Sequence, residues 1–433
     1  MADEILTTIP IPFPFPPEDS SYTTLEKCYA FWDLSSTAEW FEQRGYTLYK
    51  RKIPKFEDEL EPNMYPVLEC KAADKMTYPF PHYDPGRNSI GKLHGRNYNG
   101  KIVYAQEVED PSHHVVIKLI ATDFEEHRIL TFLQSQDLKV LEENCIVPVL
   151  NILSNGPYSF VVMPRWGGCV YRPEGGPVRN CFRIMHSLLK ALAFLHRHNI
   201  LHRDLKLDNA LVSHFSDEDT DRYKENDSRM QLQWADALQH CLFDFDLSMM
   251  LPPDTDRTRC RLPYRESWIG SWSRTHDTSQ GEFDYDPFAF DVGMLGDIFC
   301  TEYQHLCRHI PMLAPFLDRM TTRNIPKRFT AAEALEFFEV FLPKIPTTDL
   351  HARYARDPEA RESYYDVYDR WKDLPPDFIE EWKDYKEPRI PLRTILLRWL
   401  CSFERMAFIV PAVRLFFYRL THIRSRTSAS LCP

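Results

Sequence analysis

The spacing of hydrophobic and polar residues predicts a β-rich region from about residue 89. KIVYAQEVED alternates as a strand, PSHH is typical of a turn, and VVIKLIA predicts a second strand. DFEEHRILTFLQSQ then places apolar residues at helical spacing, and CIVPVLNILSNGPYSFVVMPRW predicts two strands joined by an Asn-Gly turn. Residues 89–165 are therefore expected to form a small β-rich lobe with one helix.

From about residue 166 the apolar positions follow a helical period. PVRNCFRIMHSLLKALAFLHRHN begins with Pro177 and ends in basic residues, which suits a helix C-terminus. DPFAFDVGMLGDIFCTEYQHL and FTAAEALEFFEVFL predict further helices, so residues 166–344 are expected to form a mainly helical lobe. Within it, an acidic insert at 213–240 is expected to be a surface loop ending in one short helix.

The flanking segments, 1–88 and 345–433, are interpreted as extensions. The proline-rich residues 8–18 predict an extended arm, and residues 22–84 an irregular segment with one or two helices. The C-terminal end is basic and amphipathic. We expect it to pack on the helical lobe, because Pro411 is expected to break its helix; peripheral contact with a membrane is the alternative.

Composition narrows the class of protein. The chain of 433 residues is 43% hydrophobic and 27% charged, which is typical of a folded protein. Its net charge of −11 argues against a nucleic-acid-binding surface. The 11 cysteines have no paired spacing, the N-terminus has no signal-peptide pattern, and no apolar run is long enough to span a membrane. We expect a cytoplasmic or nuclear protein with reduced thiols; the oligomeric state is left open.

The segment HRDLKLDN, residues 202–209, concentrates charged and polar side chains in one short loop. Asp204 is placed to orient a substrate hydroxyl and accept its proton, and Lys206 to offset charge on a transferring phosphoryl group. Asn209, together with Asp244 from the later CLFDFDLS, offers oxygen ligands for magnesium. Phosphoryl transfer needs mainly positioning and charge neutralisation, which these residue types supply.

Lys118 lies inside the apolar strand VVIKLI and needs a partner there, unless the strand is at an edge and the lysine reaches solvent. Glu126, eight residues later on the predicted helix, is favoured as that partner over Glu125. Gly95 and Gly100 precede the first strand of this region. They predict a β-turn-β that approaches phosphate with its backbone N–H groups, with an ordinary hairpin as the alternative.

These motifs together resemble those of eukaryotic-type protein kinases. The matches are GRNYNGKI for the glycine-rich loop, VVIK for the strand lysine, HRDLKLDN for the catalytic loop and DFD for the magnesium motif. FDVGMLGDIF resembles the buried helix whose aspartate, here Asp291, braces the catalytic loop, and Arg328 stands in the family's arginine position. A lysine two residues after Asp204 is the serine/threonine pattern. The extensions and insert are similar in style to those of divergent kinase-like proteins of basidiomycete fungi.

The resemblance implies an α+β, bilobal kinase-like fold over residues 89–344, with ATP and Mg²⁺ as cofactors and a protein or peptide substrate. It implies that Met163 gates the adenine pocket and that the chain near Pro164 and Arg165 forms the hinge. The site residues it implies are, for catalysis, His202, Arg203, Asp204 and Lys206; for ATP, Gly95, Gly100, Ile102, Lys118, Glu126 and Met163; and for the metal, Asn209 and Asp244.

Three positions depart from the kinase pattern. Asn97 replaces the middle glycine of the phosphate loop, and Asp246 replaces the glycine of the magnesium motif. The Ala-Pro-Glu motif is missing, so Arg328 is left with Glu282 or Asp277 as an ion-pair partner. These departures keep a pseudokinase, or nucleotide-binding scaffold, open as the alternative to a serine/threonine kinase, with a small-molecule kinase as a third hypothesis.

Arg203 predicts control by phosphorylation of the activation segment, because a phosphate there pairs with this arginine in the family. The candidate phosphorylation sites are Thr255, Thr258, Ser267 and Ser271.

Overall fold

The computed structural model describes residues 8–13, 22–51, 63–69, 77–84, 93–96, 100–168, 176–216, 227–269, 275–358 and 364–422. Helices and strands are mixed along the chain, which confirms the expected α+β class. The chain divides into two compact units. Unit 1 comprises residues 1–171 and 210–243, and unit 2 comprises residues 172–209 and 244–433.

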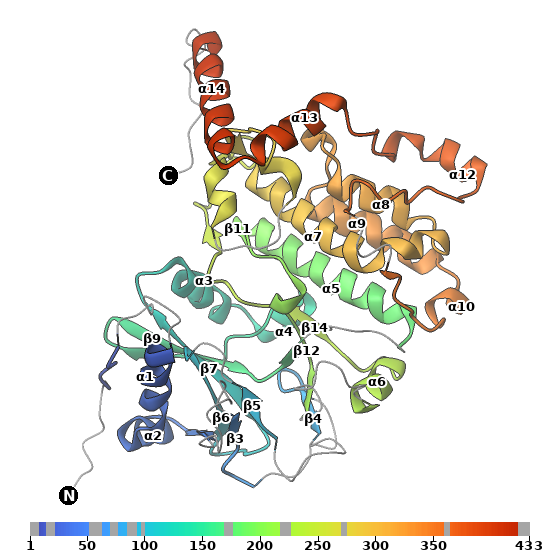
Figure 1. Ribbon diagram of the computed structural model, residues 1–433. Coiled ribbons are helices and arrows are strands. Elements are labelled where there is room, and N and C mark those ends of the chain that lie inside the picture. The colour runs from blue at the N-terminus through green and yellow to red at the C-terminus, as the bar shows by residue number, and fades with distance from the viewer. Residues whose placement is uncertain are drawn as a thin grey trace, which may run out of the picture. The chain divides into compact units, whose positions relative to one another are not determined.

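Unit 1 is built on a five-stranded antiparallel sheet of order β1-β6-β7-β9-β8 (Figure 1). The predicted turn between its last two strands is present, with Gly156 at a φ of +65°, which glycine adopts without steric cost. The elements are β1 (Tyr46–Leu48), β6 (Ile102–Glu107), β7 (His114–Ala121), α3 (Glu125–Gln134), α4 (Leu138–Glu143), β8 (Asn151–Asn155) and β9 (Tyr158–Pro164).

Part of the expected N-terminal extension belongs to the core of unit 1. It forms the two helices α1 (Tyr22–Asp33) and α2 (Ser35–Glu42), and the strand β1 that pairs with β6. The rings of Trp40 and Phe41 pack on Phe160 of β9, with centroids 5.3 and 4.9 Å away. Burial of aromatic side chains is the main stabilising term of such a core, so this segment is integral to the unit.

The remaining strands of unit 1 are short. β13 pairs in parallel with β4, and the insert contributes helix α6 as expected; its residues 217–226 lie outside the described residues. The strands and helix are β2 (Lys50–Arg51), β3 (Asn63–Tyr65), β4 (His82–Asp84), β5 (Gly95–Arg96), β10 (Gly167–Gly168), β12 (Ala210–Val212), β13 (His214–Ser216), α6 (Asp227–Trp234) and β14 (His240–Leu242).

Unit 2 is mainly helical, and the three helices predicted for it are present: α5 (Val178–Arg197), α7 (Pro287–Tyr303) and α9 (Ala331–Phe341). Their ends follow local sequence. The Asp286 carboxylate accepts a hydrogen bond from Ala289 N at the start of α7, and Thr330 with Glu333 forms a capping box at the start of α9.

The other elements of unit 2 are mostly short. They are β11 (Ile200–Leu201), η1 (Leu207–Asn209), β15 (Met249–Met250), β16 (Leu262–Pro263), η3 (Tyr264–Trp268), η4 (His276–Thr278), β17 (Asp284–Tyr285), η5 (Gln304–Arg308), α8 (Leu313–Thr321), η6 (Ile325–Lys327), η7 (Leu342–Lys344), α10 (Thr347–Leu350), α12 (Pro376–Glu381), η8 (Lys383–Tyr385), α13 (Leu392–Cys401) and α14 (Glu404–His422).

The C-terminal extension packs into unit 2 beyond residue 344. The buried Arg370 guanidinium donates to Asp318 Oδ1 at 2.8 Å, and Trp371 Nε1 donates to Asp318 Oδ2 at 2.7 Å. The expected helix break at Pro411 is wrong, because α14 runs through it. Proline leaves the Ala407 carbonyl without its helical donor, and the Tyr264 hydroxyl donates to that oxygen at 3.3 Å instead.

The cysteines of the described residues are all free thiols. No helix in the described part of the chain is long and apolar enough to cross a bilayer.

Candidate functional site

Asp291 of α7 fixes the backbone of the loop that follows β11. Its Oδ2 accepts a hydrogen bond from His202 N at 2.8 Å, and its Oδ1 accepts one from Arg203 N at 3.0 Å. His196 Nε2 lies 3.1 Å from the same carboxylate. Arg203 has a φ of +66°, a strained value for a side chain of this size, and the two bonds to Asp291 hold it there. The expected brace is confirmed.

Asp204 is the centre of the polar cluster in this loop. It is 3% exposed, and its Oδ2 accepts hydrogen bonds from Lys206 Nζ at 2.6 Å and from Asn209 Nδ2 at 2.9 Å. The other carboxylate oxygen, Oδ1, is buried without a hydrogen-bond partner among the described residues. An unsatisfied buried acceptor costs roughly 1–3 kcal/mol, and a ligand hydroxyl that donates to Oδ1 would remove that cost.

The Lys206 ammonium is surrounded by carboxylates. Burial alone would lower its pKa, but the hydrogen bond to Asp204 and the charges of Asp204, Asp244 and Asp246 raise the pKa of Lys206 above its usual value. Lys206 is therefore protonated at neutral pH and able to stabilise an anion. Asp246 is exposed, and its charge adds to the negative potential around Lys206.

The donors in this loop suit magnesium. The Asn209 side chain donates both of its hydrogen bonds to Asp204 through Nδ2, which leaves its amide oxygen for a metal. Asp244, whose charge acts on Lys206, adds a carboxylate. No cluster of three or more His, Cys, Asp or Glu side chains among the described residues is arranged to hold a metal. Mg²⁺ is usually bound through one or two carboxylates plus substrate phosphates, so two protein ligands are compatible with it.

His202 joins this loop to the segment that carries Asp244. The Ser248 hydroxyl donates to His202 O at 3.0 Å, and the His202 ring centroid lies 5.7 Å from that of Phe245. Asp244 has a φ of +67°, in the left-handed region, so the backbone turns sharply at this residue. His202 is buried and joins the two segments through these contacts.

Lys118 and Glu126 form the expected pair in unit 1. Lys118 Nζ lies 2.5 Å from Glu126 Oε1, and both side chains are largely buried. The edge-strand alternative is wrong, because β7 lies between β6 and β9, with Ile102 and Val161 opposite Lys118. Glu125 instead pairs with Arg128 at the surface.

The two glycines do not flank a β-hairpin, so this expectation needs correction. In the described part of the chain β5, which begins at Gly95, pairs with β3, whereas β6 pairs with β1 and β7. Gly100 has a φ of +68°, and a Cβ there would lie 2.4 Å from Cys28 Cβ; its carbonyl accepts a hydrogen bond from Trp32 Nε1 at 2.8 Å. Gly100 is thus required by close packing on α1. Asn97 lies outside the described residues.

The segment after Met163 contains a feature that the sequence analysis missed. Arg165 is buried, and its backbone N–H donates to His114 O at 2.9 Å. Its guanidinium donates to Tyr49 Oη at 2.9 Å and lies 4.1 Å from the Phe215 ring centroid. Cation–π contacts and neutral acceptors stabilise this cation, and no local pattern in the sequence indicates them.

Arg203 already has an acidic partner. Its Nη2 donates to Glu266 O at 2.8 Å and to Glu266 Oε2 at 3.1 Å. Of the candidate phosphorylation sites, Ser267 is buried and donates to Tyr264 O at 2.7 Å, which makes it inaccessible to a modifying enzyme. Thr258 is exposed, Thr255 is half-buried, and Ser271 lies outside the described residues.

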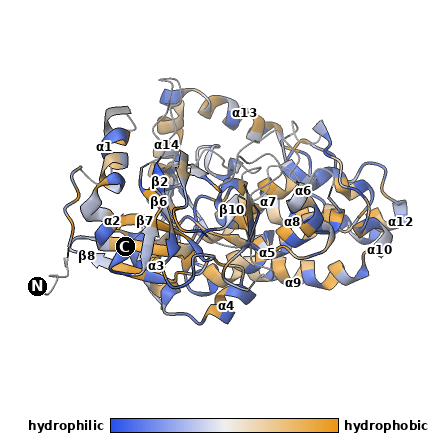
Figure 2. Cartoon of the chain, turned by 90° about the horizontal axis from the view of Figure 1, so that it is seen from below, coloured by the Kyte–Doolittle hydropathy of each residue, from blue (hydrophilic) through white to orange (hydrophobic). Residues whose placement is uncertain are grey.

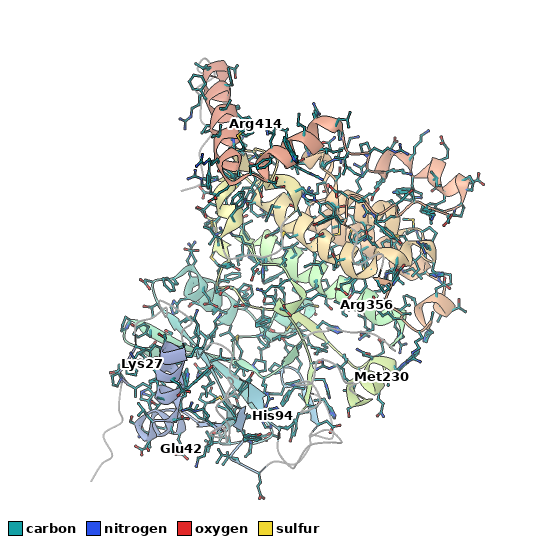
Figure 3. The ribbon with its side chains drawn as sticks, in the orientation of Figure 1. Lys27, Glu42, His94, Met230, Arg356 and Arg414 are labelled. Carbon is teal, nitrogen blue, oxygen red and sulfur yellow. The ribbon has the colours of Figure 1, made fainter. Side chains whose placement is uncertain are left out.

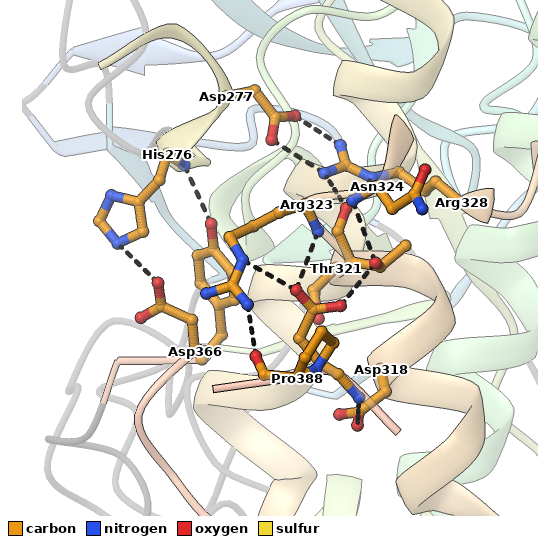
Figure 4. Close-up of polar contacts among 12 residues, drawn as sticks. His276, Asp277, Asp318, Thr321, Arg323, Asn324, Arg328, Asp366 and Pro388 are labelled. Carbon is orange, nitrogen blue, oxygen red and sulfur yellow. Dashed lines mark hydrogen bonds and ion pairs between the residues drawn. The ribbon is translucent and has the colours of Figure 1, made fainter. Parts of the chain in front are cut away.

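The open question of the Arg328 partner is answered by Asp277 (Figure 4). Nη2 of Arg328 donates to Asp277 Oδ1 at 2.8 Å, and Nη1 donates to the other carboxylate oxygen. The second candidate, Glu282, lies 4.0 Å from Arg414 instead. Asp277, and not Glu282, is therefore the ion-pair partner of Arg328.

The sequence matches no family model and no curated protein.

Proposed function

We propose that the chain is an ATP- and magnesium-dependent protein kinase of serine and threonine hydroxyls, with a bilobal kinase-like fold. The observation that supports this proposal most is the state of Asp204. It is a buried carboxylate whose Oδ2 accepts hydrogen bonds from Lys206 and Asn209 and whose Oδ1 has no partner in the part of the chain that the structure describes. A hydroxyl that donates to the second oxygen is oriented and can pass its proton to it.

The proposal gives each of the other residues a defined task. Lys206 offsets the charge of the transferring phosphoryl group, and its raised pKa keeps it cationic. Asn209 and Asp244 hold Mg²⁺, which supplies charge neutralisation between phosphates when bound. Lys118, held by Glu126, binds the α- and β-phosphates of ATP. Asp291 keeps the loop backbone in place, and the Arg203 side chain links the loop to Glu266.

The test is phosphate transfer by the purified chain and by Asp204→Asn, with phosphosites mapped by mass spectrometry after incubation with Mg-ATP. General-base roles contribute about 100-fold or more, so Asp204→Asn is expected to lose at least that factor while keeping its melting temperature. Asp208→Asn is the matched control, because this aspartate lies in the same loop with an exposed side chain. Equal transfer by the wild type and Asp204→Asn would contradict the proposed role.

A nucleotide-binding scaffold without useful transfer is the second candidate. Two observations favour it. Gly100 packs against Cys28, and the Arg165 backbone N–H donates a hydrogen bond to His114 O. Neither of these backbone groups is then available to bind a nucleotide. A rise in melting temperature with Mg-ATP, with no phosphate transferred, would select this candidate.

A further inference from the structure

Helices α13 and α14 each present apolar side chains to solvent. On α13, and at Phe403 two residues after it, the exposed apolar side chains follow helical spacing. On α14 they occupy the face opposite the packed one; Figure 2 shows the mixed hydropathy of α13. Leu392 is 84% exposed and Phe417 is 60% exposed. The exposed apolar residues are Leu392, Ile395, Leu396, Trp399, Phe403, Phe408, Ile409, Val413, Phe416, Phe417 and Leu420. This set is called the tail face below.

The opposite side of α14 is anchored in unit 2, so the tail face has a fixed orientation. Val410 fills the space beside Gly281, where a Cβ would lie 2.3 Å from Val410 Cγ1. The Tyr418 ring lies 5.1 Å from that of Phe283, and Arg414, labelled in Figure 3, donates to Gln280 O at 3.0 Å. Because one side of the helix is already packed, the tail face is a second, separate surface.

The charge of this region indicates what the tail face meets. Residues 391–433 contain seven arginines and one glutamate, a net charge of +6, so the other 390 residues carry −17 of the total of −11. Arg393, Arg405 and Arg419 are exposed on the same two helices. Aromatic and aliphatic side chains beside arginines are typical of helices that lie in the interface of an anionic bilayer.

We propose that the tail face binds an anionic phospholipid surface, with α13 and α14 lying along the interface. The apolar side chains enter the region between headgroups and acyl chains, and the three exposed arginines bind lipid phosphates. A symmetric contact between two copies of the tail face would bring these arginines together, which disfavours self-association through it. This inference does not depend on the proposed kinase activity.

The test is co-sedimentation of the full chain with phosphatidylcholine vesicles, with and without phosphatidylserine. Binding is expected only to the phosphatidylserine vesicles and is expected to weaken as salt is added. The triple variant Arg393→Glu/Arg405→Glu/Arg419→Glu should bind at least about 100-fold more weakly, at roughly 5-fold per lost arginine. Phe416→Ser/Phe417→Ser should also weaken binding, since it removes two inserted rings.

The matched control is Arg128→Glu/Lys139→Glu/Arg259→Glu, which makes the same change of charge at exposed positions elsewhere. It should bind as the wild type does, and circular dichroism should show every variant folded. The salt dependence of the wild type tests the proposal even where a variant does not fold. No binding of the wild type to anionic vesicles would overturn it, as would equal binding by the two triple variants. A dimer in light scattering that Phe416→Ser/Phe417→Ser abolishes, without vesicle binding, would assign the face to a second copy instead.

Discussion

Removal of Asp277 is expected to destabilise unit 2 strongly. The Arg328 side chain is 1% exposed and that of Asp277 is 11% exposed, so the pair is almost free of solvent screening. Burial alone would lower the pKa of Arg328, but the Asp277 carboxylate raises it, so the arginine remains charged whenever the chain is folded. Asp277→Ala therefore leaves a buried cation whose remaining partners are the carbonyl oxygens of Ala289 and Thr322.

The expected loss in free energy of unfolding follows from the geometry of the Arg328–Asp277 ion pair. Two unit charges about 4 Å apart attract by roughly 4 kcal/mol at an effective dielectric constant of about 20. Breaking a buried pair on one side costs about 3–5 kcal/mol. For a unit of 150–250 residues each kcal/mol lowers the melting temperature by about 2–4 °C, so Asp277→Ala should melt roughly 6–20 °C lower than the wild type.

The assay is calorimetry together with urea unfolding of the wild type, Asp277→Ala and a control, Glu380→Ala. Glu380 also forms an ion pair, with Lys383, but both side chains are mostly exposed, so its removal should leave the melting temperature unchanged. In Asp277→Ala/Arg328→Met the buried charge is gone, so the double variant should lose less than the sum of the single changes. A melting temperature for Asp277→Ala equal to that of Glu380→Ala would refute the reasoning.

Three further predictions concern pH, packing and the loop. Burial lowers the pKa of His114 and of His214 from 6.5 to about 3, so the unfolded chain takes up these protons first as the pH falls. The free energy of unfolding should fall below pH 6.5, by roughly 2 kcal/mol per histidine at pH 5, and urea titrations of His214→Gln should show a weaker pH dependence. Gly100→Ala should lower the melting temperature through the clash with Cys28 and the positive φ, whereas Gly168→Ala, with open space around it, should not. In Asp291→Asn the side chain has one acceptor oxygen, so it can accept only one of the two hydrogen bonds from the loop backbone. Hydrogen exchange of the His202 and Arg203 amides should therefore accelerate, while the amides of α9 remain protected from exchange.

The features predicted correctly from sequence depend on short spacings or on regular periods. Lys118 and Glu126 are eight residues apart, and the helical phase alone favours Glu126 over Glu125. Asp291 was assigned through the resemblance of its helix to a known motif, and its hydrogen bonds to the loop agree. The kinase activity and the ATP and Mg²⁺ cofactors remain proposals.

The features missed or mispredicted depend on contacts between distant residues. Gly95 and Gly100 were expected to flank a β-turn-β, but β5 pairs with β3. The packing of Gly100 on α1 involves a hydrogen bond from Trp32, 68 residues away, which leaves no local pattern. The environment of Arg165 is assembled from Tyr49 and Phe215, which lie on either side of it in sequence. The choice between Asp277 and Glu282 for Arg328 was open, since spacing alone does not say which side of a loop faces the arginine.

The hydrogen bonds from Asp291 to the loop of residues 202–209 also have a consequence for the order of events during synthesis. The carboxylate that fixes Arg203 N lies 88 residues later in the chain. At about 5–20 residues per second on the ribosome, the loop waits roughly 4–18 s before its brace has been made. During that interval a growing chain holds HRDLKLDN without its final backbone conformation. Ribosome-bound chains that end before α7 should therefore lack the fixed backbone of this loop, even where helix α5 has already formed.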